Sequence, residues 1–223
     1  MPPPTAAPGA RRILLLVPSS RPDEAPHRDG LRIETFAAAF YALRDAGLDV
    51  VIAAPAAGYP PVAPIAAGSA DPVVARFARD REAREELGDP LPLDRVFADE
   101  FDALLVLGGP AALTDFAGDA RIGALVDGFA GTGRPVAAIG GGRAALLPAR
   151  DGAGRPLVRG RRIAALAADR ATGLDAALAA LGAAARGEAA LVVDGPLITA
   201  VDAAAGAAAA ALLAALGPPG AGP

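Results

Sequence analysis

The chain has 223 residues, of which 53% are hydrophobic, 21% are charged and only 4% are aromatic. This composition excludes a disordered chain and predicts one folded domain whose core consists of Leu, Val, Ile and close-packed Ala. The net charge is −4, so nothing suggests the concentrated basic surface of a nucleic-acid-binding protein.

The residue types that are missing exclude several kinds of chemistry. The chain has no Cys, a single His and no Lys, a bias that we attribute to a GC-rich genome. Thiolate catalysis, a multi-histidine metal site, a Schiff-base lysine and a phosphate loop with its lysine are therefore excluded. We expect no metal and no cofactor.

We find no convincing signal peptide or spanning segment, so we expect a cytoplasmic protein that does not bind membranes.

Predicted strands and helices alternate along the chain. Buried strands are predicted at 12–17, 49–53, 102–107 and 135–139, and helices at 31–46, 73–87, 120–131, 142–147, 172–181 and 203–216. Two hairpins are also expected, one joining 156–158 to 162–165 and one joining 191–193 to 197–199 through the turn Asp194-Gly195.

This alternation predicts a single α/β domain with a mostly parallel central sheet and helices on both faces. We place the domain at residues 12–217, between disordered tails at 1–11 and 218–223.

Polar residues and glycines follow three of the predicted strands, at the edge where parallel sheets bind ligands. The candidate ligand-binding residues there are Ser19, Gly108, Gly109, Thr114, Gly140, Gly141, Gly142 and Arg143. Ser20 also lies in the first of these loops, together with His27, and Glu34 follows on the next helix. We take Glu34 and His27 as the candidate catalytic residues, because a carboxylate and an imidazole can exchange a proton.

Several stretches of the chain resemble one known family. They are GLRIE (30–34), YALRDAGLDVV (41–51), LPL (91–93), FDALLVLGG (101–109), RPVAAIGGGRAALL (134–147), PLVRGRR (156–162) and VVDGPLIT (192–199). In them the chain is similar to the ThiJ/PfpI superfamily, in the branch of glutathione-independent glyoxalases and chaperone-deglycases. The resemblance implies the flavodoxin-like fold of class I glutamine amidotransferases, and a homodimer.

The chemistry of that family does not carry over to this sequence. The resemblance implies a nucleophilic Cys followed by His at a strained turn, but Gly140 and Gly141 occupy these positions. The family's Gly-Gly-His-Gly loop reads GGPA at 108–111, and a further His position falls near Ala190. Of the usual site residues only Glu34 remains, which in relatives hydrogen-bonds the thiol. We therefore exclude the Cys-dependent glyoxalase, deglycase, amidotransferase and protease reactions.

Glycine at the strained turn has a physical explanation. A side chain there costs about 1–3 kcal/mol of backbone strain, which glycine avoids. We expect the missing side chains at Gly140 and Gly141 to open a pocket larger than that of catalytic relatives, with Glu34 on its wall.

Each candidate residue has a structural alternative. Glu34 either lines the pocket, where it can act as a base with a raised pKa, or is a solvated helix residue. His27 either pairs with Glu34 or lies on the surface. Gly140–Gly142 either cradle an anion or only form a tight turn. Arg143 either meets an anionic ligand or points into solvent.

Two functions remain open. The first is a degenerate family member that binds a small molecule, carbonyl-bearing or anionic, or acts as a partner or chaperone-like protein. The second is a cofactor-independent isomerase, lyase, hydratase or cyclase with Glu34 as general acid or base. A buried Glu34 beside an open cavity would favour the enzyme, and a cavity filled by neighbouring side chains would favour a scaffold.

Overall fold

A computed structural model describes residues 11–19, 30–56, 58–63, 70–110, 112–165, 173–185 and 189–217. The two predicted tails fall outside these ranges except for Arg11, whose guanidinium donates hydrogen bonds of 2.6 Å to the carbonyls of Leu216 and Gly217. Ser20 and His27 also lie outside the described residues.

A seven-stranded sheet in the order β3-β2-β1-β4-β5-β9-β8 forms the centre of the molecule. Its strands are β1 (Arg12–Leu16), β2 (Asp49–Ala54), β3 (Leu91–Pro92), β4 (Ala103–Gly108), β5 (Val136–Gly140), β8 (Leu191–Asp194) and β9 (Leu197–Ala200). All neighbours run parallel except β8 and β9, which form the antiparallel hairpin predicted around Asp194-Gly195. The predicted mostly parallel α/β fold is confirmed.

The central strands are apolar on both faces, which explains their continuous hydrophobic runs. Side chains alternate across the sheet, so Ile13 and Leu15 of β1 join one core while Leu14 and Leu16 join the other. All four are fully buried. Helices therefore have to cover both faces.

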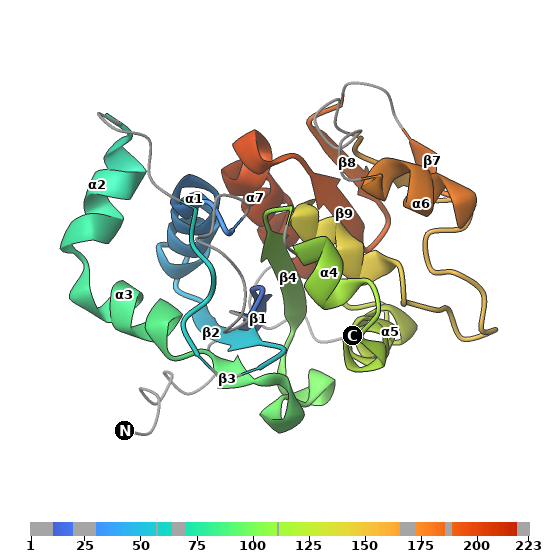
Figure 1. Ribbon diagram of the computed structural model, residues 1–223, viewed down its shortest axis with the longest axis horizontal. Helices are drawn as coiled ribbons and strands as arrows, with labels where there is room; N and C mark the ends of the chain where they lie inside the picture. Colours follow the sequence, from blue (N-terminus) through green and yellow to red (C-terminus); the bar gives the residue numbers. More distant parts are fainter. Residues whose placement is uncertain are drawn as a thin grey trace.

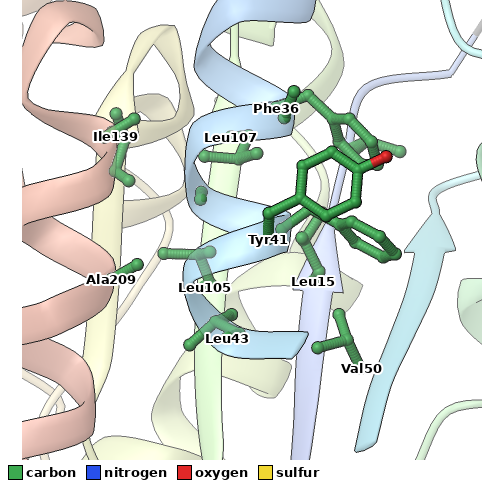
Figure 2. Packing of buried hydrophobic residues seen from close by; sticks show 14 of the residues in the cluster. Leu15, Phe36, Tyr41, Leu43, Val50, Leu105, Leu107, Ile139 and Ala209 are labelled. Atoms are coloured by element: carbon green, nitrogen blue, oxygen red, sulfur yellow. The ribbon is translucent and has the colours of Figure 1, made fainter. Parts of the chain in front are cut away.

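One face is covered by α1 (Ile33–Arg44) and α7 (Ala205–Leu216), with α2 (Pro72–Arg79) and α3 (Arg81–Gly88) at its margin (Figure 1). Figure 2 shows Phe36 and Leu43 of α1 and Ala209 of α7 over the strands. The other face is covered by α4 (Ala112–Phe116), α5 (Ala120–Gly131), α6 (Leu174–Ala180) and the 3₁₀ segment η3 (Gly141–Leu146). Shorter 3₁₀ segments are η1 (Leu93–Arg95), η2 (Ala98–Glu100) and η5 (Asp202–Ala204).

Two predicted elements are wrong. The single helix expected at 73–87 is interrupted at Asp80, whose extended backbone ends α2 and whose carboxylate accepts the Ala83 N–H at 3.0 Å to cap α3. The hairpin between 156–158 and 162–165 does not form. Instead, β6 (Arg162–Ile163) pairs in parallel with β7 (Ala184–Ala185), a partner too far along the chain for a turn signal to reveal.

Among the described residues, no helix combines the length and the apolarity needed to cross a membrane.

Candidate functional site

The strand β5 ends in a sharp turn, and we call Gly140 and the start of η3 the elbow. Gly140 has φ 56° and ψ −130°, a conformation that side-chain-bearing residues rarely adopt. The elbow lies at the carboxyl edge of the sheet, beside the end of β4, because Gly140 pairs with Gly108. The predicted position of the strained turn is therefore the observed one.

The side-chain position of the elbow is filled by a carboxylate from another element. A Cβ atom built on Gly140 would lie 2.2 Å from Oδ1 and 3.0 Å from Oδ2 of Asp202. Asp202 begins η5, directly after β9, the parallel neighbour of β5. Asp202 therefore occupies the space that the missing Gly140 side chain would leave, and the larger pocket expected around it stays a prediction.

The neighbouring glycines pack against backbone. A Cβ on Gly141 would lie 1.9 Å from the carbonyl oxygen of Gly109, and one on Gly142 would lie 2.5 Å from that of Val106. A Cβ on Gly108 would lie 2.4 Å from the Cβ of Ala112. The loops after β4 and β5 thus touch where glycine alone fits. This contact corrects the expectation of open space at Gly141 and supports the tight-turn interpretation of Gly140–Gly142.

Glu34 is connected to the elbow through its neighbour in α1. The Thr35 hydroxyl donates to Oδ1 of Asp202 at 3.4 Å, and Glu34 directly precedes Thr35. The Glu34 side chain is 26% exposed, and its Oε1 lies 4.0 Å from a terminal nitrogen of Arg32. Glu34 is thus adjacent in sequence to a residue that contacts the elbow, and its side chain is partly exposed and paired with Arg32.

Asp202 has an unusual electrostatic environment. Burial raises its pKa above the ordinary value, while the charge of Arg32, the hydrogen bond from Thr35 and the charge of Arg143 lower it, and burial prevails.

The sequence interpretation missed Asp202 because it is a single acidic residue in front of an alanine-rich helix. The one available signal was its position after a predicted strand. That signal could be used only if the strand order, with β9 beside β5, was already known.

Arg143 is fully buried, so the alternative in which it points into solvent is wrong. Its Nε donates to the Gly140 carbonyl at 3.1 Å, and one terminal nitrogen donates to the Ala164 carbonyl at 2.5 Å and to Asp175 at 2.7 Å. These acceptors compensate for a cation placed near the start of a helical segment. Arg143 thereby ties the elbow backbone to α6.

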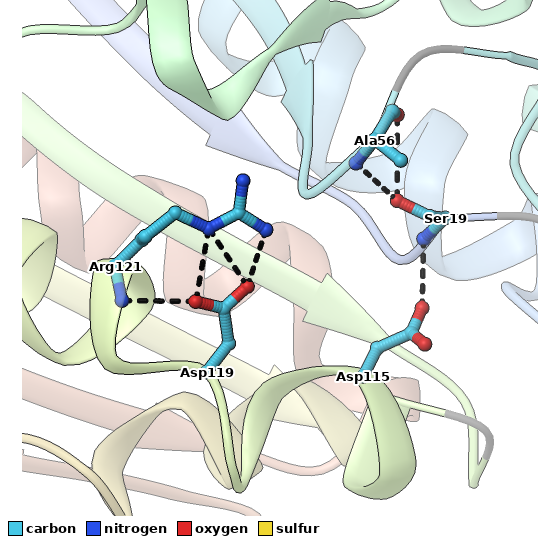
Figure 3. Close-up of polar contacts among 5 residues, drawn as sticks. All are labelled: Ser19, Ala56, Asp115, Asp119 and Arg121. Carbon is cyan, nitrogen blue, oxygen red and sulfur yellow. Dashed lines mark hydrogen bonds and ion pairs between the residues drawn. The ribbon is translucent and has the colours of Figure 1, made fainter.

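Ser19 and Thr114 have different surroundings. The Ser19 hydroxyl accepts the Ala56 N–H at 2.7 Å, and the Ser19 N–H donates to Asp115 at 2.8 Å (Figure 3). These bonds fasten the ends of β1 and β2 to α4, so the buried Ser19 serves the structure. Thr114 is exposed on α4.

The described residues hold no group of three or more acidic or His side chains that could bind a metal ion. A small cavity of about 20 Å³, room for about one water molecule, lies among Arg134, Val136 and Leu197. These residues lie at the amino ends of β5 and β9, away from the elbow.

The fold and the elbow define a class of flavodoxin-like proteins with a strained strand-to-helix turn, and the comparisons identify the family. The family model described as "DJ-1/PfpI family" matches residues 29–215. The chain therefore belongs to the DJ-1/PfpI family, which confirms the resemblance to ThiJ/PfpI proteins.

Solved structures agree with this assignment. One is 27% identical, with a TM-score of 0.78 and coverage of 93% of this chain and 98% of its own. The Rapid Encystment Protein of Francisella tularensis is 22% identical, with a TM-score of 0.81 over 92% and 99%. Glyoxalase III from Candida albicans is 18% identical, with a TM-score of 0.76 over 92% and 97%. These last two likenesses show the fold. No curated protein matches this chain.

Proposed function

We propose that this chain is a DJ-1/PfpI-family protein that has no thiol-dependent activity and binds a small molecule at the elbow, beside Glu34. The observation that carries the proposal is the elbow itself. The sequence has no Cys, Gly140 keeps the strained backbone geometry, and a carboxylate stands where a side chain would project. Ligands bind at this edge in parallel sheets, and Glu34 is exposed enough to contact one.

A second candidate function is a cofactor-independent enzyme that uses Glu34 as general acid or base for isomerase, lyase, hydratase or cyclase chemistry. The observation in its favour is the second carboxyl group, Asp202, at the elbow. Two carboxyl groups in different surroundings can divide the roles of acid and base.

The proposal also includes a homodimer. Light scattering during size-exclusion chromatography would measure the mass of the particle in solution and so test this oligomeric state.

A screen of neutral and anionic small molecules by thermal unfolding tests the binding site. A ligand at 100 times its Kd stabilises the folded state by about 2.7 kcal/mol, which raises the Tm by several degrees. We expect a binding compound whose effect is lost in Glu34→Gln and kept in Glu85→Gln. Glu85 is a suitable control because it is an exposed helix glutamate that also pairs with an arginine, Arg81, at 2.7 Å.

An assay with methylglyoxal tests the excluded chemistry, since one structural neighbour is a glyoxalase. We expect no turnover above background by the purified protein. Turnover that Glu34→Gln abolishes would show that the family reaction proceeds without a thiol and would contradict the proposal.

A further inference from the structure

The carboxyl group of Asp202 lies at the side-chain position of the elbow. We propose that Asp202 is the acid–base residue of the elbow and exchanges a proton with an oxygen atom of a small neutral ligand. This inference rests on the proposed function, because it requires that a ligand reaches the elbow.

The first argument is geometric. Both carboxylate oxygens of Asp202 lie within 3.0 Å of the Cβ position of Gly140, so they stand where a side chain of the elbow would begin. An elbow presents its side chain at the carboxyl edge of the sheet, where substrates bind in α/β folds. Here Gly140 at the end of β5 provides the turn, and Asp202 in η5, which follows the neighbouring strand β9, provides the carboxyl group.

The second argument is electrostatic. Partial burial favours the neutral carboxyl group. Arg32 in front of α1, the Thr35 hydroxyl on α1 and Arg143 on η3 favour the carboxylate. Burial and these groups therefore act in opposite directions on the proton equilibrium of Asp202. The net effect raises the pKa of Asp202.

The charges also indicate the class of ligand. Arg32, whose charge acts on Asp202, pairs with Glu34 at 4.0 Å, so the two charges balance each other and favour a neutral ligand. A neutral carboxyl group offers an O–H donor, which a carbonyl or hydroxyl oxygen accepts. In the transfer the proton passes from Asp202 to that oxygen. The carboxylate left behind is stabilised by Thr35 and the two arginines, and the reverse transfer restores the neutral acid.

Labelling with ethyl diazoacetate tests this inference without a known ligand. The reagent esterifies a protonated carboxyl: the carboxyl proton moves to the diazo carbon, N₂ leaves, and the carboxylate oxygen bonds to that carbon. At a pH of about 6, where ordinary Asp side chains are ionised, we expect Asp202 to react at least about tenfold faster than exposed carboxylates. Peptide mass spectrometry measures the rates residue by residue.

Asp127 is the matched control. Burial raises its pKa as well, but it lies on α5, away from the elbow, and accepts the Arg150 N–H at 2.5 Å. Labelling of Asp202 no faster than that of Asp127 would overturn the inference, because burial alone would then explain the reactivity.

Two variants connect the labelling to the elbow. Gly140→Ala places a Cβ on the Asp202 carboxylate and should abolish its preferential labelling, whereas Gly133→Ala, with φ 73° and nothing within 4 Å, should not. Asp202→Asn should raise the Tm at neutral pH, because burial disfavours the charged carboxylate in the folded state, and this advantage should disappear as the pH falls through the raised folded pKa to 3.8. An unchanged Tm difference across this range would overturn the inference.

The outcomes separate this inference from the proposed function. Reactive Asp202 together with a thermal screen that finds no ligand would contradict the proposed binding site. A ligand that depends on Glu34 while Asp202 reacts like Asp127 would contradict the acid–base role alone.

Discussion

At the scale of single residues, the elbow combines a backbone position and a side chain that come from different strands. Gly140 has a backbone conformation that favours glycine, and Asp202 brings a carboxylate to the position where a side chain would begin. The two residues therefore depend on each other, because a Cβ on Gly140 and the carboxylate of Asp202 cannot occupy the same space. A change at one is expected to alter the effect of a change at the other.

Gly140→Ala should reduce the free energy of unfolding by about 1–3 kcal/mol more than Gly133→Ala, the usual cost of forcing extra atoms into occupied space. Both changes put a side chain on a backbone with positive φ, but only the first collides with another group. The double variant Gly140→Ala/Asp202→Ala should recover part of this difference, as urea unfolding would measure. Strictly additive effects of the two changes would show that Asp202 does not press on the elbow.

At the scale of elements, the break between α2 and α3 depends on one carboxylate. Asp80 accepts the Ala83 N–H at 3.0 Å at the start of α3 and the Tyr41 hydroxyl at 2.9 Å from α1. The backbone bond from Ala83 is the main cause that lowers the pKa of Asp80. Burial and the hydrogen bond to Asp80 raise the pKa of Tyr41 to about 12. Asp80 thus ends one helix, begins the next and holds the pair against α1.

Asp80→Ala should lower the free energy of unfolding by about 1–2 kcal/mol, the usual cost of a lost helix cap. Because the folded pKa of Asp80 is lowered, its stabilising effect is complete above the ordinary value of 3.8 and disappears as the pH falls through the folded pKa. The difference between wild type and variant should therefore shrink in acid. The control Asp89→Ala changes an exposed residue at the other end of α3 and should cost less than about 0.5 kcal/mol. Equal losses in the two variants would contradict the capping role.

At the scale of the whole molecule, Arg143 connects the sheet to one of its outer layers. Its guanidinium joins the end of β5, the Ala164 carbonyl that follows β6, and Asp175 of α6. Ala164 is itself held to β9, because its N–H donates to the Thr199 hydroxyl at 2.8 Å. A buried network of hydrogen bonds therefore holds the elbow in place, in addition to apolar packing.

Arg143→Met should lower the free energy of unfolding by about 3–5 kcal/mol, because it leaves buried acceptors without their donor. Arg155→Met is the matched control. Arg155 also pairs with an aspartate, Asp151, at 2.8 Å, but its side chain is 63% exposed, so we expect a loss under about 1 kcal/mol. Urea unfolding measures both. Similar losses would mean that the Arg143 network does not stabilise the fold.

The amino-acid sequence by itself determined the parallel α/β architecture and the absence of a thiol, and its resemblance to the ThiJ/PfpI superfamily implied the strained turn at Gly140. The architecture could be predicted because its signals are local: apolar runs form the buried strands, and glycines mark the turns. The break at Asp80 and the pairing of β6 with β7 were missed, because they depend on a side-chain cap and on a partner distant in the chain.

Only the tertiary structure decided what stands at the elbow. The sequence separates Gly140 from Asp202 by 62 positions, and nothing in the residues between them signals that β9 runs beside β5. The pairing of these two strands brings the carboxylate to the glycine, and the charges of Arg32 and Arg143 reach it from two other elements. The protonation of Asp202 is therefore a property of the assembled sheet and not of any segment, because burial and long-range charges exist only once the chain is folded.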